Sequence, residues 1–119
     1  MKFIQTDRAP AAIGPYSQAI LADGWLWCSG QVALDPATGK LVEGGIEEQT
    51  RRVLENLSAV VAEAGGTLAD VVKTTVYLID LAEFGAVNKV YAEFFTSDLP
   101  ARGVVGAAAL PKGALVAIE

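Results

Sequence analysis

The clearest hydrophobic pattern in the chain lies between Ile46 and Ala64. Apolar residues recur there at steps of three, four and seven, which is the period of a helix with one buried face. They are Ile46, Val53, Leu54, Leu57, Val60, Val61 and Ala64. Gly65-Gly66 follows directly and supplies a stop that tolerates positive φ. We therefore predict a helix over Ile46–Ala64.

A second helical pattern runs from Leu81 to Phe95. Its apolar stripe consists of Phe84, Val87, Tyr91, Phe94 and Phe95. Asp80 and Glu83 stand in the positions of a capping box, with Asp as the capping residue. The pattern predicts a helix that begins at about Leu81.

Strand patterns occupy much of the remaining chain. In the run Val71–Ile79, one face carries Val72, Thr74, Val76 and Leu78, and the other carries Lys73, Thr75 and Tyr77. Ala19–Ala22 and Trp25–Cys28 flank Asp23-Gly24, an arrangement typical of a hairpin. The run from Asp35 to Gly39 has the proline and glycine of a turn. Two short strands are predicted over Gly103–Ala109 and Leu115–Glu119, joined through residues 110–113.

The predicted order is strand, strand, strand, helix, strand, helix, strand, strand. Helices and strands mix without strict alternation, which favours an α+β or mixed α/β fold with the helices on one face of a sheet. A chain of 119 residues has the length of one domain, residues 1–119. Because apolar residues make up 52% of the chain, we expect other subunits to cover the open face of the sheet.

Charge and composition exclude several classes of function. The chain has 9 basic and 14 acidic residues, and its scattered cations do not favour nucleic acid as a partner. It has no histidine, which excludes histidine-based catalysis and imidazole zinc sites. A single cysteine, Cys28, excludes an intrachain disulfide. Without a signal-peptide pattern or an apolar run of membrane-spanning length, the expected location is the cytoplasm, with no membrane partner.

Two polar residues break an apolar pattern. Asn88 shares the stripe of the second helix with Phe84 and Tyr91, so its amide either bonds nearby backbone or contacts a ligand or an interface. Arg102 enters an apolar strand, so it either pairs with a carboxylate of the chain or binds the carboxylate or phosphate of a ligand.

Other candidates have structural alternatives of their own. Tyr16 lies in a loop before a strand, where it either packs with a solvated hydroxyl or meets a ligand. Ser29-Gly30 is either a simple strand end or a point of close approach for a ligand or another chain. Cys28 is expected to be a buried, unreactive thiol.

Several separated motifs together resemble the RidA/YjgF family of reactive-intermediate imine deaminases. Near the N-terminus these are Ala9-Pro-Ala-Ala-Ile-Gly-Pro-Tyr-Ser-Gln18, Cys28-Ser-Gly-Gln31 and Asp35-Pro-Ala-Thr-Gly39. The middle matches through Gln49-Thr-Arg-Arg-Val-Leu-Glu-Asn-Leu57 and Val71-Val-Lys-Thr-Thr-Val-Tyr-Leu78. The last part matches through Asn88, Tyr91-Ala-Glu-Phe-Phe95, Pro100-Ala-Arg102 and Leu110-Pro-Lys-Gly113. The resemblance covers essentially the whole chain.

The resemblance implies a chorismate-mutase-like α+β fold with two helices on one face of a mixed sheet. Three subunits pack their sheets into a homotrimer, with a ligand pocket at each subunit interface. The implied reaction hydrolyses reactive 2-imino or 2-enamino acids, such as 2-aminoacrylate and 2-iminobutyrate, to 2-keto acids and ammonia. It implies no metal and no organic cofactor.

The family's site carries over by position. Arg102 would hold the substrate carboxylate, and Tyr16 would line the pocket and help to place the imine or the water. The other implied substrate-binding positions are Ser29, Gly30, Asn88, Val104 and Ala117. The contacts of Gly30 and Val104 would come from their backbones.

One position departs from the family. Members that deaminate imines usually have a glutamate fifteen positions after the arginine, where it orients the attacking water, and here that position is Ala117. Glu119 lies two residues further on the same face of the predicted strand, about 7 Å away, and matches the family's second acidic position. A missing water-positioning base lowers the rate roughly 10²–10⁴-fold.

Three hypotheses follow. The first is an imine deaminase weakened by Ala117. The second is a non-catalytic member of the same fold that binds a small 2-keto or 2-imino carboxylate and has a regulatory role. The third is RNA cleavage, against which stand the absence of histidine and the net charge of −5.

Overall fold

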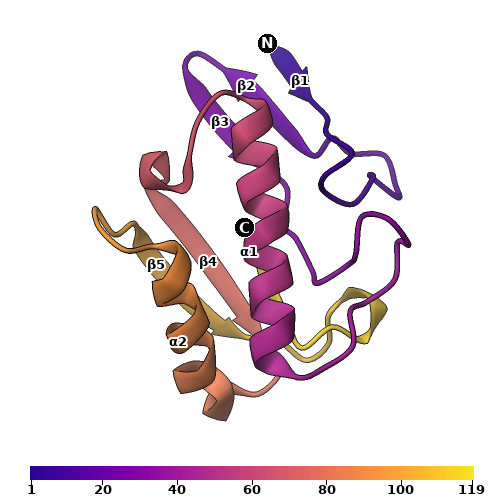
Figure 1. Cartoon of the computed structure of the whole chain (residues 1–119), viewed down its shortest axis with the longest axis vertical. Helices are drawn as coiled ribbons and strands as arrows, with labels where there is room; N and C mark the ends of the chain where they lie inside the picture. Colours follow the sequence, from indigo (N-terminus) through magenta and orange to yellow (C-terminus); the bar gives the residue numbers. More distant parts are fainter.

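A computed structural model describes the whole chain, residues 1–119. Its helices and strands follow the predicted order (Figure 1). They are β1 (Lys2–Ile4), β2 (Ala19–Ala22), β3 (Trp25–Cys28), α1 (Ile46–Glu63), β4 (Lys73–Leu78), α2 (Phe84–Phe94), β5 (Ala101–Gly106) and β6 (Val116–Ile118). Single 3₁₀ turns occupy Leu68–Asp70, Leu81–Glu83 and Pro111–Gly113. Neither α-helix is long and apolar enough to cross a membrane.

The strands form two three-stranded groups that meet at Gln31. One group has the antiparallel order β1-β2-β3, and the other has the order β5-β4-β6 with β4 and β5 parallel. Gln31 follows β3, donates its N–H to Ile118 of β6 at 2.9 Å and accepts from the N–H of Ile118 at 3.1 Å. The order across the molecule is therefore β1-β2-β3-β6-β4-β5, with β5 at the edge far from β2 (Figure 1). The predicted α+β class is confirmed.

The predicted hairpin and turn are both present. Asp23 and Gly24 have φ values of 52° and 80°, so both central residues of the β2–β3 connection have the positive φ of a type I′ turn. In the Asp35 turn, the carbonyl of Asp35 accepts from the N–H of Gly39 at 2.8 Å. These local signals predicted the backbone correctly because each turn depends on its own residues.

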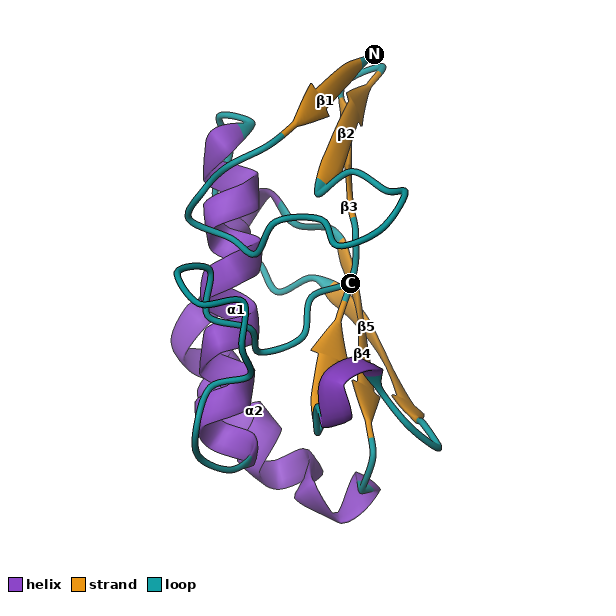
Figure 2. Cartoon of the chain, turned by 90° about the vertical axis from the view of Figure 1, so that its right-hand side faces the viewer, coloured by secondary structure: helices purple, strands orange, loops and turns teal.

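Both helices lie on one side of the strands (Figure 2). The main core forms between them and the central strands, where Leu54, Val76, Val87 and Ile118 are essentially inaccessible to solvent. The other side of the strands carries large apolar side chains in the open: Phe3 is 64% exposed, Trp25 57% and Trp27 67%. A single chain therefore leaves an apolar sheet face uncovered, as its composition predicted.

The strand predicted over Gly103–Ala109 lies instead at Ala101–Gly106, and three further details of the prediction are wrong. The second helix begins at Phe84, because Leu81–Glu83 form a 3₁₀ turn first. Asp80 does cap this turn, accepting from the N–H of Ala82 at 2.9 Å, but Glu83 makes no reciprocal bond. Val72 was predicted to share a strand face with Thr74, Val76 and Leu78, which are buried, but it is 60% exposed because β4 begins only at Lys73.

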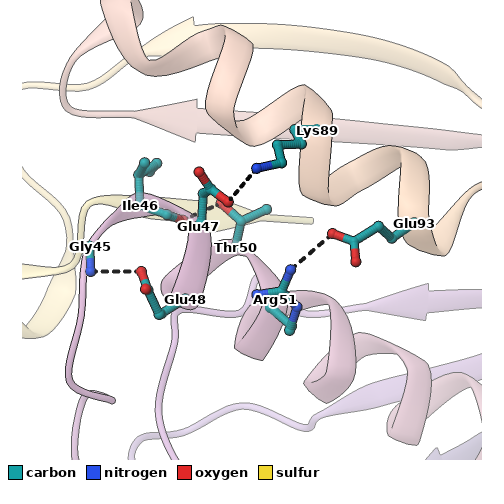
Figure 3. A network of polar contacts seen from close by, with 8 residues as sticks. All are labelled: Gly45, Ile46, Glu47, Glu48, Thr50, Arg51, Lys89 and Glu93. Carbon is teal, nitrogen blue, oxygen red and sulfur yellow. Dashed lines mark hydrogen bonds and ion pairs between the residues drawn. The ribbon is translucent and has the colours of Figure 1, made fainter.

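Polar contacts at the N-terminal half of α1 fix the two helices to each other (Figure 3). Arg51 pairs with Glu93 at 2.9 Å, and Lys89 pairs with Glu47 at 3.4 Å. Both pairs are exposed, so each stabilises the fold by at most about 1 kcal/mol. These ion pairs join α2 to α1 through Lys89 and Glu93. Another side of α2, with Phe84 and Tyr91, faces β4 and β5.

Candidate functional site

Arg102 lies on β5 and extends toward α2. Its guanidinium carbon is 5.1 Å from the ring centroid of Phe84 and 4.8 Å from that of Tyr91. The ion pairs of the molecule involve Arg51 and Lys89, so the alternative that Arg102 pairs with a carboxylate of the chain is wrong. Two aromatic faces stabilise the cation instead. The N–H donors of Arg102 have no partner within the chain.

Tyr91 is held in place beneath this guanidinium. Its hydroxyl and that of Thr74 lie 2.8 Å apart and share a buried hydrogen bond. Its ring also stacks on Phe95, with the centroids 4.5 Å apart. Thr74 is the neighbour of Arg102 in the β4–β5 register, so the strand that positions the arginine also fixes its aromatic support.

Asn88 occupies the helical turn between Phe84 and Tyr91. Its Oδ1 atom is buried and has no hydrogen-bond partner. The interpretation that this amide bonds nearby backbone is therefore wrong. A buried amide oxygen without a donor is costly, and it is a ready acceptor for a ligand N–H.

Val104 completes this side of the site. It lies two residues after Arg102 on β5 and packs against the main core. Asn88, Arg102 and Val104 are called the arginine cluster below. Sequence reasoning missed Phe84 and Tyr91 as supports of Arg102, although their spacing around Asn88 on one helical stripe was a usable signal.

Ser29 is hydrogen-bonded to the two residues that follow Tyr16. The Ser29 hydroxyl donates to the carbonyl of Ser17 at 2.6 Å, and the Ser29 N–H donates to that of Gln18 at 2.9 Å. Tyr16 is half exposed, and its hydroxyl accepts a long 3.4 Å bond from the N–H of Ile13. These contacts set the loop before β2 against the end of β3.

Gly30 lies against the C-terminal strand. A Cβ atom at Gly30 would be 3.7 Å from the Cβ of Glu119, so the two residues are immediate neighbours. The expectation that Ser29-Gly30 ends a strand is confirmed, because β3 stops at Cys28. Tyr16, Ser29, Gly30 and Ala117 are called the loop cluster below.

Ala117 lies on β6 opposite Tyr77 of β4. The Tyr77 hydroxyl donates to Oε1 of Glu119 at 2.6 Å. This hydrogen bond raises the pKa of Tyr77, because ionising the phenol would break it and set two negative charges side by side. Tyr77 was not predicted as a site residue, because its place opposite Ala117 depends on the pairing of β4 with β6, which the strand pattern does not contain.

The arginine cluster and the loop cluster are separate within one chain. Arg102 sits on the edge strand β5 and faces the helices, whereas Ala117 faces the open side and Tyr16 precedes β2. Tyr16 lines a cavity of about 600 Å³ with residues of the N-terminal segment, including Phe3, Thr6 and Gln18. Arg102 is not part of that cavity.

Cys28 lies outside both clusters. It is half-buried, packs against the core, and has no disulfide partner. The predicted burial is therefore only partial, but it raises the pKa of the thiol, which agrees with the predicted lack of reactivity.

The chain is similar in sequence and in structure to known proteins. Residues 6–119 match the family model described as Endoribonuclease L-PSP. The chain is 50% identical over 118 residues to a 2-iminobutanoate/2-iminopropanoate deaminase of Mus musculus, covering 99% of this chain and 87% of the mouse protein. RidA from an Antarctic Psychrobacter bacterium superimposes with a TM-score of 0.96 at 46% identity, covering 99% of this chain and 95% of that one. Escherichia coli TdcF with bound serine has a TM-score of 0.94 at 39% identity, covering 99% and 94%. The chain therefore belongs to the Endoribonuclease L-PSP family, the family of the RidA/YjgF proteins.

Proposed function

We propose that the protein hydrolyses small 2-imino and 2-enamino acids, such as 2-iminobutyrate and 2-aminoacrylate, to 2-keto acids and ammonia. The observation that carries this proposal is the unpaired guanidinium of Arg102, which lies over the rings of Phe84 and Tyr91, the residues on either side of the unpartnered amide oxygen of Asn88 on the same helix. These groups match the two polar ends of an imino acid. The fork of Arg102 binds the carboxylate, and Oδ1 of Asn88 accepts from the imine N–H.

Arg102 is suited to this role by its surroundings. A guanidinium binds a carboxylate through two parallel N–H bonds, which fixes the orientation of the substrate as well as its position. The rings of Phe84 and Tyr91 hold its plane and remove part of its water, which strengthens the ion pair with a bound carboxylate. No carboxylate of the chain competes for it.

The relatives support both the proposed reaction and the proposed binding of a small carboxylate. The mouse relative is named a 2-iminobutanoate/2-iminopropanoate deaminase, and the E. coli structure holds serine, a small amino acid with a carboxylate. Serine resembles the proposed substrates in size and in charge at its carboxylate end.

The proposed site is completed by a second copy of the chain in a homotrimer. The arginine cluster lies on the edge strand β5 and faces the helices, whereas the loop cluster lies around the end of β3 and on β6, and the exposed face of β1 to β3 is apolar. Packing that face against another copy buries the apolar side chains and brings the loop cluster of one copy to the arginine cluster of the next. Tyr16, Ser29 and Gly30 then form the wall opposite Arg102.

The proposed reaction needs positioning more than a strong catalyst. The oxygen of one water bonds to C2 of the substrate, and one water proton moves to the nitrogen. The C–N bond of this adduct then breaks as the hydroxyl proton moves to the nitrogen, which releases ammonia and leaves a 2-keto acid. Imines hydrolyse in water unaided, so holding the substrate and one water in line is an effective contribution.

Turnover of 2-iminobutyrate tests the proposal. A threonine dehydratase generates the imine in situ, and its decay is followed with the unchanged protein, Arg102→Ala, Arg102→Lys and the control Arg8→Ala. Arg8 is exposed on the N-terminal segment and belongs to neither cluster. We expect Arg102→Ala to lose activity roughly 10²-fold or more, and Arg102→Lys to recover part of it without the bidentate geometry. Full activity in Arg102→Ala contradicts the proposed role.

A second candidate function rests on Ala117. A methyl group cannot orient water, so the same pocket without turnover would be a binding module for a small carboxylate that reports it to a partner. Binding of 2-ketobutyrate by calorimetry without acceleration of imine decay supports the binding module. Acceleration of imine decay supports the deaminase.

A further inference from the structure

We propose that Glu119 is the group that places the attacking water in this chain, and that Tyr77 is its positioning residue. This inference rests on the proposed deaminase function and names a further residue for it. Three observations support it: the carboxylate of Glu119 accepts from the hydroxyl of Tyr77, the residue lies beside Gly30, and Ala117, opposite Tyr77, has a small side chain.

Glu119 lies at the loop cluster. Its backbone pairs with Thr75, accepting at 2.8 Å and donating at 3.0 Å, so its position next to β4 is fixed. Its Cβ lies beside Gly30, and its carboxylate reaches the hydroxyl of Tyr77, the residue opposite Ala117. The methyl group of Ala117 leaves room on this face between the carboxylate and a ligand.

The hydrogen bond leaves half of the carboxylate free. Tyr77 donates to Oε1, and no other hydrogen bond or ion pair within the chain holds the Glu119 side chain. Tyr77 stays protonated at neutral pH, since the bond to Glu119 raises its pKa, so it remains a donor throughout. Oε2 is therefore held in a defined direction with its lone pairs available to water.

The chemistry of this carboxylate balances in two steps. Glu119 takes one proton from water as the water oxygen bonds to C2, and it returns that proton to the substrate nitrogen. It then takes the hydroxyl proton of the adduct and passes it to the leaving nitrogen as the C–N bond breaks. The carboxylate is unchanged at the end, and the products are the 2-keto acid and ammonia. General base work of this kind contributes roughly 10²–10⁴-fold to a rate.

Kinetics of Glu119→Gln and Tyr77→Phe test the inference, with Glu63→Gln as the matched control at an exposed site on α1. For Glu119→Gln we expect kcat to fall roughly 10²-fold with KM nearly unchanged, because substrate binding depends on Arg102. Tyr77→Phe should give a smaller loss of kcat.

Rescue separates a chemical role from a structural one. Adding Ala117→Glu to Glu119→Gln restores a carboxylate to the same strand face, and we expect it to recover much of the lost kcat. Equal activity of Glu119→Gln and Glu63→Gln in an active protein overturns the role of Glu119 alone. A Glu119→Gln loss that Ala117→Glu does not recover also overturns it. An unchanged protein with no turnover overturns the proposed function itself, and this role with it.

Discussion

The two asparagines that face inward from the helices differ in their hydrogen bonding. Asn56 is fully buried, and its Nδ2 donates to the carbonyls of Val32 at 3.3 Å and Leu34 at 3.0 Å, while its Oδ1 accepts from Nε of Arg52 at 2.9 Å. Asn88 has a buried Oδ1 with no donor. Satisfied amides of this kind stabilise a fold, whereas an unsatisfied one costs stability and is kept for another reason.

Leucine, of similar volume, separates these two roles. Asn56→Leu leaves the buried carbonyl of Leu34 without its donor, at a cost of about 1–3 kcal/mol, so the free energy of unfolding should fall clearly. The carbonyl of Val32 still accepts from the N–H of Leu34 at 2.8 Å. Asn88→Leu removes an unsatisfied amide, so stability should hold or rise while turnover of 2-iminobutyrate falls. Urea denaturation and the imine assay measure the two effects. Equal destabilisation by both substitutions would show that Asn88 has a structural partner.

The sequence singled out unusual residues but did not predict which residues contact them. Arg102 and Asn88 stood out because each breaks an apolar pattern, and that reasoning needs only local spacing. The rings that support Arg102 come from α2, and the carbonyls that bind Asn56 come from the segment after β3. Such partners depend on how elements pack, and hydrophobic period alone does not contain that information.

At the scale of the elements, helix α1 begins with an acidic first turn. Glu47 and Glu48 stand where the helix dipole favours negative charge, and Glu48 Oε2 accepts from the N–H of Gly45 at 2.9 Å (Figure 3). Gly44 before it has a φ of 110°, and a Cβ there would lie 2.7 Å from the Glu48 side chain. The glycine pair thus lets the carboxylate fold back over the helix end.

The bonds to Glu48 make the helix start dependent on pH. Hydrogen bonds from its own backbone N–H and from that of Gly45 lower the pKa of its carboxyl. A lowered pKa contributes stability above the unfolded-state pKa, and that contribution is lost as pH falls through the folded-state pKa. We expect Glu48→Gln to lower the thermal midpoint at pH 7, and the difference from the unchanged protein to shrink in acid. Glu63→Gln, at the other end of α1, should show no such pH-dependent difference.

Element boundaries were predicted well where one residue type decides them. Gly65 has a φ of 92°, and α1 ends just before it, as the glycine pair predicted. The start of α2 was less predictable, because Asp80 caps a 3₁₀ turn as readily as an α-helix. The ends of β5 were also hard to predict, because pairing with β4 decides them: β5 begins at Ala101 and ends at Gly106.

At the scale of the molecule, the sheet is covered on one face only. Sequence patterning predicted this asymmetry, since helices that follow one another across a sheet share a face. It did not predict that the implied site residues fall into two clusters within a chain. That division depends on strand order, with β5 at one edge and β1 to β3 at the other, and hydrophobic period does not encode strand order.

Trp27 tests whether the open face joins copies of the chain. Its side chain is 67% exposed on β3, opposite Ile20 of β2, so Trp27→Glu should leave the fold of one chain intact. In the proposed trimer it buries a charge in an apolar interface, which costs several kcal/mol and should dissociate the assembly. Analytical ultracentrifugation should then show a smaller species, and imine turnover should fall with it because the two clusters no longer meet.

Leu81→Glu, at an exposed apolar side chain outside the sheet, is the matched control and should keep both the assembly and the imine turnover. A Trp27→Glu protein that stays assembled and active contradicts the interface, and one that dissociates yet keeps full turnover contradicts a site shared between copies.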